Sequence, residues 1–119
     1  MSEWNDTQPI FLQIRQRLIE MILREVAREG EALPSVRQIS ADLRVNPLTV
    51  SKAFQSLVDI GVVESRRGLG MFVAGGAKPR LLAYEREKFL AEEWPAIRAR
   101  MRTLDLDIAE LLHREDRKP

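Results

Sequence analysis

The chain contains no cysteine and only one histidine, His113. Without cysteine it can form no disulfide framework and no thiolate metal site, and it has no thiol nucleophile. The single histidine lies near the chain end among charged residues, which predicts an exposed side chain with no ligand role. No GxSxG, P-loop or HExxH pattern is present. We therefore expect no enzymatic activity, no metal and no cofactor.

Long apolar runs are absent as well. No stretch approaches the ~18 consecutive apolar residues of a membrane-spanning helix. The first six residues include acidic side chains where a signal peptide carries basic ones, and no apolar segment follows. With 119 residues and 45% hydrophobic content, the chain is long enough for one folded domain and a small appendage. These features predict a cytoplasmic protein with no membrane partner.

A large excess of positive charge is the third missing feature. The 19 lysines and arginines are balanced by 18 aspartates and glutamates, so the net charge is +1. Many nucleic-acid-binding proteins are far more basic. Residues 35–56 nevertheless carry three basic side chains against one acidic side chain, and Arg66 and Arg67 follow. Such local charge can neutralise phosphates even when the total charge is near zero.

Two short helical patterns stand one turn apart in the middle of the chain. The first is expected over about 35–43. Ser35 and the glutamine three residues later have the spacing of a capping box, in which each side chain bonds to a free backbone amide at the start of the helix. The second is expected over about 47–60, with Asn46 as N-cap and Pro47 at the first helical position. The three-residue connection between them has the length of a helix-turn-helix turn.

A hairpin and an earlier helix complete this pattern. Residues 62–73 read as two short strands around a glycine-rich tip. A helix-turn-helix followed by such a hairpin is a winged helix, and its usual use is to bind DNA. Residues 9–28 predict a first helix with Thr7 as N-cap. Its inner face is expected from apolar residues spaced by three or four, namely Phe11, Ile14, Leu18, Ile22 and Val26.

The composition changes after a short glycine-containing joint at 74–77. Residues 78–102 are charged and helix-prone, and Pro95 is expected to kink or restart the helix. Asp105 is the expected N-cap of a last short helix. We therefore predict two parts, a winged helix-turn-helix DNA-binding domain at 1–76 and a C-terminal helical dimerisation segment at 77–119.

The dimerisation assignment follows from size. A helical pair of about forty residues cannot bury its own core, so it must pack on the first domain or on a second copy. Helix-turn-helix proteins are commonly dimers, because a two-fold protein reads a palindrome. The apolar residues assigned to the homodimer contact are Leu82, Phe89, Trp94, Ile97, Met101, Ile108, Leu111 and Leu112.

Four ordered segments resemble the DNA-binding domain of GntR-type bacterial regulators. They are PIFLQI at 9–14, LPSVR at 33–37, NPLTV at 46–50 and RRGLGMFV at 66–73. The resemblance implies a mainly α fold with a small β-hairpin, in which a winged helix-turn-helix precedes two C-terminal dimerisation helices. The short helical pair is similar to the YtrA type. For that type the resemblance implies control of the protein's own operon, one with an ABC-type transporter. We expect a repressor that acts as a homodimer on a palindromic operator, because the chain has no segment suited to recruiting polymerase.

Ten residues are candidate DNA contacts. The resemblance places a DNA-contacting arginine at Arg37, while hydroxyls and a lysine at the start of the second motif helix suit phosphates and base edges. Arginines and glycines at the hairpin tip suit a narrow minor groove. The full set is Ser35, Arg37, Leu48, Thr49, Ser51, Lys52, Arg66, Arg67, Gly68 and Gly70.

The recognition helix departs from part of the family. Several relatives carry arginines at the positions of Pro47 and Ser51, and YtrA-type proteins often have asparagine at the position of Leu48. The operator of better-known relatives therefore cannot be transferred to this chain. Leu48 either contacts a thymine methyl group or is a tolerated exposed leucine, and the sequence leaves both readings open.

Two further alternatives stay open. The near-zero net charge is also compatible with a winged helix that serves as a protein–protein interaction module without specific DNA binding. A small-molecule effector, if one exists, would fit at the dimer interface near Tyr84 and Trp94, because the helical segment is too short to enclose a ligand within one subunit.

Overall fold

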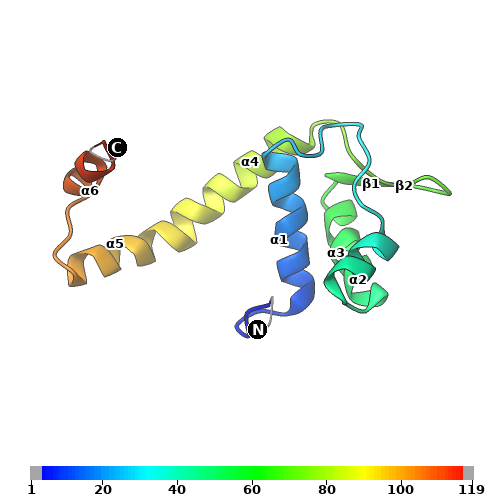
Figure 1. The fold of residues 1–119 in the computed structure, drawn as a ribbon. Coiled ribbons are helices and arrows are strands. Elements are labelled where there is room, and N and C mark those ends of the chain that lie inside the picture. The colour runs from blue at the N-terminus through cyan, green and yellow to red at the C-terminus, as the bar shows by residue number, and fades with distance from the viewer. Residues whose placement is uncertain (1–3, 117–119) are drawn as a thin grey trace. The chain divides into compact units, whose positions relative to one another are not determined.

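The computed structural model describes residues 4–116 (Figure 1). The chain divides into two compact units, with the boundary between Leu82 and Ala83. The predicted fold class, mainly α with a small β-hairpin, is confirmed. The elements are α1 (Ile10–Leu23), α2 (Val36–Leu43), α3 (Pro47–Asp59), β1 (Val63–Arg66), β2 (Gly70–Val73), α4 (Ala77–Lys88), the π-helical turn η1 (Phe89–Glu93), α5 (Trp94–Thr103) and α6 (Ile108–Asp116).

The core of the first unit lies where α1 and α2 pack on α3. Apolar residues spaced by three and four put one face of each helix inward, and full burial of each such side chain stabilises the fold by about 1.5–3 kcal/mol. The start of α4 also belongs to this core, because Ala77 and Leu81 are fully buried. The largest fully buried side chains are Ile14, Leu18, Ile19, Ile22, Val50, Phe54, Leu57, Val62, Val73 and Leu81.

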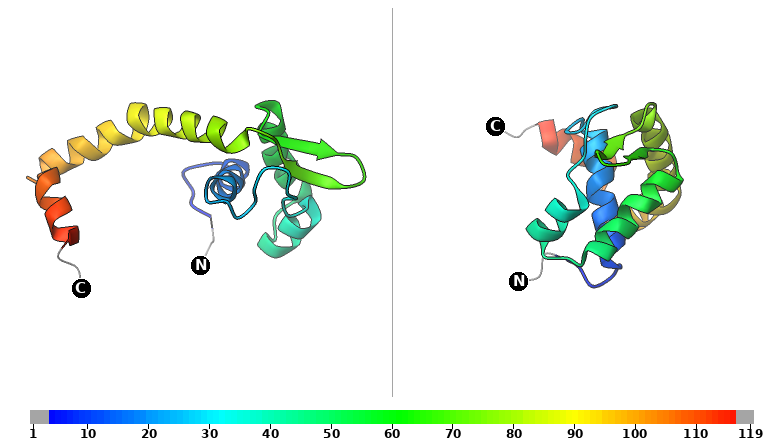
Figure 2. Two further views of the ribbon diagram at one scale, coloured as in Figure 1. Left: turned by 90° about the horizontal axis from the view of Figure 1, so that it is seen from above. Right: turned by 90° about the vertical axis from the view of Figure 1, so that its right-hand side faces the viewer.

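The wing is an antiparallel hairpin in which Val63 pairs with Val73 and Arg66 pairs with Gly70. Val63 and Val73 anchor its base in the core, whereas every residue from 64 to 70 is exposed. The hairpin therefore extends away from the helices of its unit, as Figure 2 shows.

The connection between α1 and α2 adds a third strand-like segment to the wing. The amide of Gly30 donates to the Val73 carbonyl at 2.8 Å, the Val73 amide donates to Glu31 at 2.9 Å, and the Leu33 amide donates to Met71 at 2.8 Å. The isolated bridge between Ala32 and Phe72 belongs to the same pairing. The pairing of residues 30–33 with β2 satisfies backbone groups on the side that β1 leaves open.

The two ends of α1 differ from the prediction. Thr7 is not the N-cap, since its amide and hydroxyl bond to the Asn5 side chain and α1 begins after Pro9 without a side-chain cap. At the other end the helix stops at Leu23, because Glu25 turns into the left-handed region with φ 60°. The chain leaves the helical path there, so Val26 is exposed instead of lying on the inner face.

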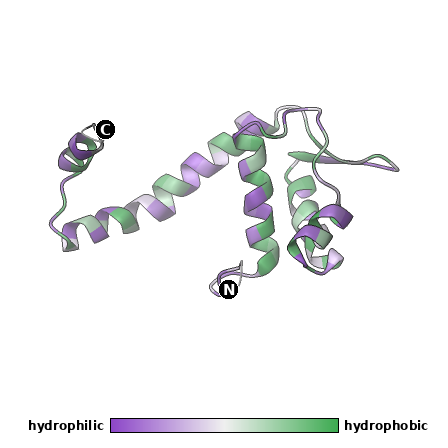
Figure 3. Ribbon diagram, in the orientation of Figure 1, coloured by the Kyte–Doolittle hydropathy of each residue, from purple (hydrophilic) through white to green (hydrophobic). Residues whose placement is uncertain are grey.

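The second unit confirms the interruption at Pro95. The Trp94 amide bonds to the Phe89 carbonyl, five residues earlier, and α5 begins at this point. A wider π turn accommodates a proline that lacks an N–H and would collide with a carbonyl of the preceding α-helical turn. Polar and apolar segments alternate along α4, α5 and α6 (Figure 3), and no helix among residues 4–116 is long and apolar enough to cross a membrane.

Asp105 is not the N-cap of α6, contrary to the prediction. It takes a left-handed conformation with φ 53° in the corner after α5. The Asp107 side chain, directly before α6, accepts from the Ala109 amide at 3.3 Å and is the cap.

Gly61 ties the end of α3 to α4. Its φ is +78°, and a Cβ at this position would lie 2.6 Å from Arg80 Nη1. That same nitrogen donates to the Ile60 carbonyl at 3.0 Å, so Gly61 leaves the space through which the guanidinium reaches the backbone. Gly30 has a similar φ of +83°, but a Cβ there would meet nothing within 4 Å.

We expect Gly61→Ala to lower the free energy of unfolding more than Gly30→Ala. Each substitution forces alanine into a left-handed conformation at a cost of about 1–2 kcal/mol. Gly61→Ala also displaces the Arg80 hydrogen bond, which contributes about 1 kcal/mol more. Urea denaturation of the two variants measures the difference, and equal losses would mean that Arg80 reorients at no cost.

Candidate nucleic-acid interface

The turn between α2 and α3 is held by backbone geometry. Arg44 ends α2 in the left-handed region with φ 54°, and the next amide, that of Val45, donates to Ser40 at 3.1 Å. The Ser40 hydroxyl in turn donates to the Val45 carbonyl. These bonds fix the direction in which α3 leaves the turn.

Both helices of the motif carry the predicted side-chain caps. Ser35 Oγ accepts from the Gln38 amide at 3.0 Å, which satisfies one orphan donor of α2. Asn46 Oδ1 accepts from the Leu48 amide at 2.8 Å, and Pro47 occupies the first turn of α3. The two helix N-termini are therefore ordered ends whose remaining amides can face an anion.

The first turns of α3 present a mixed polar and apolar surface. Leu48, Ser51 and Lys52 are exposed and Thr49 is half-buried, because Val50 of the same turn points into the core. Val50, Ala53, Phe54 and Leu57 form the buried side of α3, and its candidate contacts other than Thr49 are exposed. Arg37 on α2 is exposed as well.

Lys52 has a partner that the sequence did not indicate. Its ammonium lies 4.0 Å from the centroid of the Phe11 ring on α1. A cation over an aromatic face keeps its charge while its side chain loses freedom. Lys52 is therefore directed by α1 as well as by its own helix.

The two wing arginines differ in environment. The Arg66 guanidinium lies 4.2 Å from the centroid of the Phe72 ring and 3.2 Å from Glu64 Oε2. Glu64 and Phe72 are cross-strand partners, and Arg66 is two residues along from Glu64, so all three project from one face. Arg67 is exposed at the tip, and among residues 4–116 it forms no ion pair.

The glycines of the wing tip have the backbone that the turn requires. Gly68 has φ 75° and Gly70 has φ 116°, both in the region that favours glycine. The Leu69 amide closes the turn onto the Arg66 carbonyl at 2.9 Å. Arg67 and Leu69 therefore project from a narrow tip.

The residues assigned to dimerisation are all accessible. Trp94, Met101 and Leu111 are half-buried, and the other five are exposed: Leu82, Phe89, Ile97, Ile108 and Leu112. Among the described residues of the second unit, none is buried in the single chain. The apolar surface of this unit is thus available to a partner.

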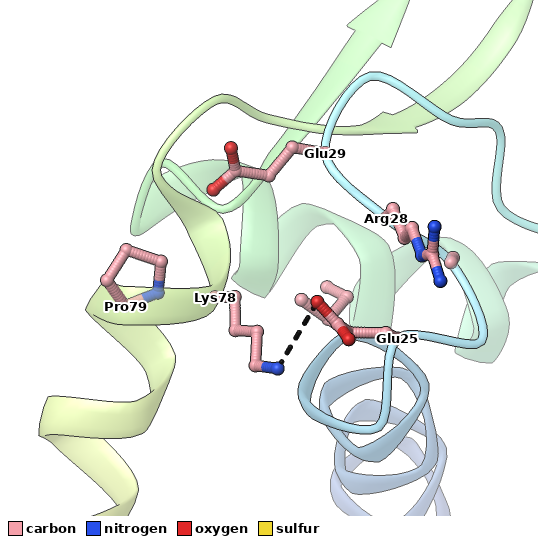
Figure 4. Close-up of a pocket in the computed structure, with 7 residues that line it drawn as sticks. Glu25, Arg28, Glu29, Lys78 and Pro79 are labelled. Carbon is pink, nitrogen blue, oxygen red and sulfur yellow. Dashed lines mark ion pairs between the residues drawn. The ribbon is translucent and has the colours of Figure 1, made fainter.

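Two of the hollows among the described residues, both apart from the candidate DNA contacts, have similar volumes. One, of about 340 Å³, is lined by the end of α1, the residues after it and the start of α4, where Lys78 Nζ lies 3.4 Å from Glu25 Oε1 (Figure 4). The other, of about 330 Å³, is lined by Tyr84, Glu87, Lys88, Ala91 and Glu92. Trp94, named with Tyr84 as a place for an effector, does not line it.

Comparison with known proteins identifies the family. Residues 11–73, from the start of α1 to the end of β2, match the family described as "Bacterial regulatory proteins, gntR family". The chain belongs to this family. The matched region contains all ten candidate DNA contacts of this gntR-family protein.

Relatives from Bacillus subtilis (strain 168) refine this assignment. The chain is 30% identical over 111 residues to the HTH-type transcriptional regulator YhcF, covering 93% of this chain and 90% of the relative. It is 39% identical over 74 residues to the HTH-type transcriptional repressor YtrA, covering 62% of this chain and 57% of that relative.

Solved structures agree. A GntR family transcriptional regulator from Listeria monocytogenes has a TM-score of 0.74 at 21% identity and covers 98% of this chain and 100% of its own, which shows the shared fold. YtrA from Sulfolobus acidocaldarius has a TM-score of 0.60 at 29% identity, with 78% and 83% covered. The DNA-binding domain of AraR, in complex with operator ORX1, has a TM-score of 0.57 at 23% identity, with 62% and 90% covered. The chain is a DNA-binding transcription regulator of the YtrA type.

We expect Asn46→Ala to destabilise this gntR-family regulator by about 1 kcal/mol, because the Leu48 amide loses its cap. Asn46→Asp keeps an acceptor at the same place and should retain stability close to that of the wild type. Chemical denaturation followed by circular dichroism compares the two variants. A loss that is the same for alanine and aspartate would show that the side-chain acceptor does not stabilise α3.

Proposed function

We propose that this regulator is a repressor that binds a palindromic operator as a homodimer. The observation that carries the proposal is the capped first turn of α3, which holds Leu48, Ser51 and Lys52 outward while Val50 is buried. A helix-turn-helix uses this part of its second helix to reach base edges in the major groove.

The other candidate contacts fit roles around that helix. Ser35 and Arg37 stand at the N-terminal turn of α2, where amides and a guanidinium suit a phosphate. Arg67 lies at the wing tip, which would reach an adjacent minor groove. The negative potential of a narrow minor groove attracts arginine. Arg66 is partly neutralised by Glu64 and serves more to shape the wing than to bind phosphate.

The homodimer follows from the second unit. Trp94, Ile97 and Met101 recur at spacings of three and four along α5 and form one apolar face, of which Ile97 is exposed and the other two are half-buried. A second copy that presents the same face is the simplest partner, since two-fold contacts are self-complementary. The half-sites of the operator would then lie about one DNA turn apart, ~34 Å.

Repression would result from occupation of a promoter. YtrA of Bacillus subtilis is a named repressor, and the AraR domain is seen with operator DNA, which supports this direction of control. By family resemblance we propose that the chain controls its own operon, one with an ABC-type transporter. It would act in the cytoplasm, where bacterial DNA lies.

The test of sequence-specific binding is fluorescence anisotropy with DNA from upstream of the protein's own gene and with a scrambled duplex. Preference for the natural DNA by about 10³-fold or more is expected of a specific regulator. Equal and salt-sensitive binding to both would leave only phosphate attraction. Binding to neither duplex would favour the use of the winged helix as a protein–protein module.

Arg67→Ala should weaken this binding and flatten its salt dependence. Each phosphate contact contributes about 0.9 to the slope of log K against log salt, and a dimer loses two contacts, so the slope should fall by about two. Arg24→Ala, which removes the same charge from an exposed position at the C-terminal end of α1, is the matched control. A slope that falls equally in both variants would assign the effect to total charge and not to the wing.

Ile97→Glu should convert the dimer to a monomer, because it places a charge on the apolar face of α5. Ala99→Glu introduces the same charge on the opposite side of that helix and should leave the dimer intact. Sedimentation velocity at equal protein concentrations measures both. If the wild type is monomeric, or if Ile97→Glu remains dimeric, α5 is not the dimer contact.

A further inference from the structure

Leu48 is the most exposed of the large hydrophobic residues that the structure describes in the first unit. It leaves 77% of its surface in contact with solvent, and Leu69 at the wing tip follows with 73%. Single exposed leucines are common on protein surfaces, so exposure alone does not assign a role. The position of Leu48 within the candidate interface does.

Leu48 occupies the outermost line of α3. The core side of the helix is formed by Val50, Ala53, Phe54 and Leu57, all fully buried. At 3.6 residues per turn, Leu48 lies directly opposite this set, and Lys52 and Gln55 continue the same line. If the exposed side of α3 faces the floor of a major groove, Leu48 is the residue in the first turn of the helix whose side chain reaches the base edges.

The two longer side chains on the same side of α3, Lys52 and Gln55, each contact another residue. The Lys52 ammonium lies over the Phe11 ring, and Gln55 Nε2 donates to Asp59 Oδ1 at 2.9 Å. Leu48 itself is held by the bond of its amide to Asn46 Oδ1. The outer side of the first turn of α3 therefore presents the apolar side chain of Leu48, with exposed Ser51 beside it.

The groups exposed in the major groove restrict which bases an apolar side chain can distinguish. Guanine, adenine and cytosine present hydrogen-bond donors and acceptors there, whereas thymine also presents a methyl group. The leucine side chain can neither donate nor accept, so only contact with that methyl group gives it a favourable burial of apolar surface. We propose that Leu48 is a specificity-determining residue that contacts the 5-methyl group of one thymine in each half-site. This inference rests on the proposed operator binding.

The experiment starts from the full-length protein and a library of randomised DNA duplexes. Repeated selection yields the enriched site directly, so the operator sequence need not be known. Each thymine of that site is then replaced in turn by deoxyuridine, in both half-sites, which removes the methyl group and keeps the hydrogen-bonding edges. Affinities for wild type and Leu48→Ala are measured by fluorescence anisotropy.

At one thymine position, uracil should weaken wild-type binding by about fourfold per half-site, the value for burial of one methyl-sized group. Leu48→Ala should bind the thymine and uracil sites equally. Leu69→Ala, which removes a leucine of similar exposure from the wing, should keep the wild-type penalty at that position. Thermal unfolding should be unchanged in Leu48→Ala, since the side chain is exposed and the Asn46 cap remains.

Two results would overturn the inference while operator binding stands. The first is an enriched site at which no uracil substitution weakens wild-type binding. The second is a uracil penalty that persists undiminished in Leu48→Ala, which would assign the methyl contact to another side chain such as Thr49. Failure of selection to enrich any sequence would instead overturn operator binding itself, and the inference with it.

Discussion

The structure depends on the way in which α3 packs against α1. Val50, Phe54 and Leu57 are fully buried at successive turns of α3, so the helix cannot rotate about its axis without exposing one of them. Because the inner side is fixed, the outer side is fixed too. The placement of Leu48, Ser51 and Lys52 is thus a consequence of core packing, and the caps at Ser35 and Asn46 set where each helix of the motif begins.

Much of the first unit could be predicted from the sequence because its signals are local. The caps depend on residues two or three positions apart, and the inner faces of α2 and α3 follow from spacings of three and four. The wing follows from two short strands around Gly68 and Gly70, whose left-handed backbone suits glycine. The break at Pro95 is also a local signal, because proline has no N–H to bond to the carbonyl one turn earlier in the same helix.

Contacts between distant segments could not be predicted in this way. The pairing of residues 30–33 with β2 has no local signal beyond extended backbone. The Lys52 ammonium over Phe11 joins helices that are far apart in sequence, and no spacing rule links them. The end of α1 and the cap of α6 were also missed, because Glu25 and Asp105 adopt left-handed backbone conformations that neither residue type requires.

The π turn at Phe89–Glu93 changes how the second unit should be compared with its relatives. A turn closed between residues five apart accommodates one residue more than an α-helical turn. Apolar positions before the turn, such as Leu82, and after it, such as Ile97, therefore belong to different helical registers. A heptad repeat that ignores the extra residue of the π turn is out of register with the apolar positions on one side of the turn. Against a relative with an uninterrupted α-helix over this segment, an alignment with a one-residue gap here would compare residues on the same face.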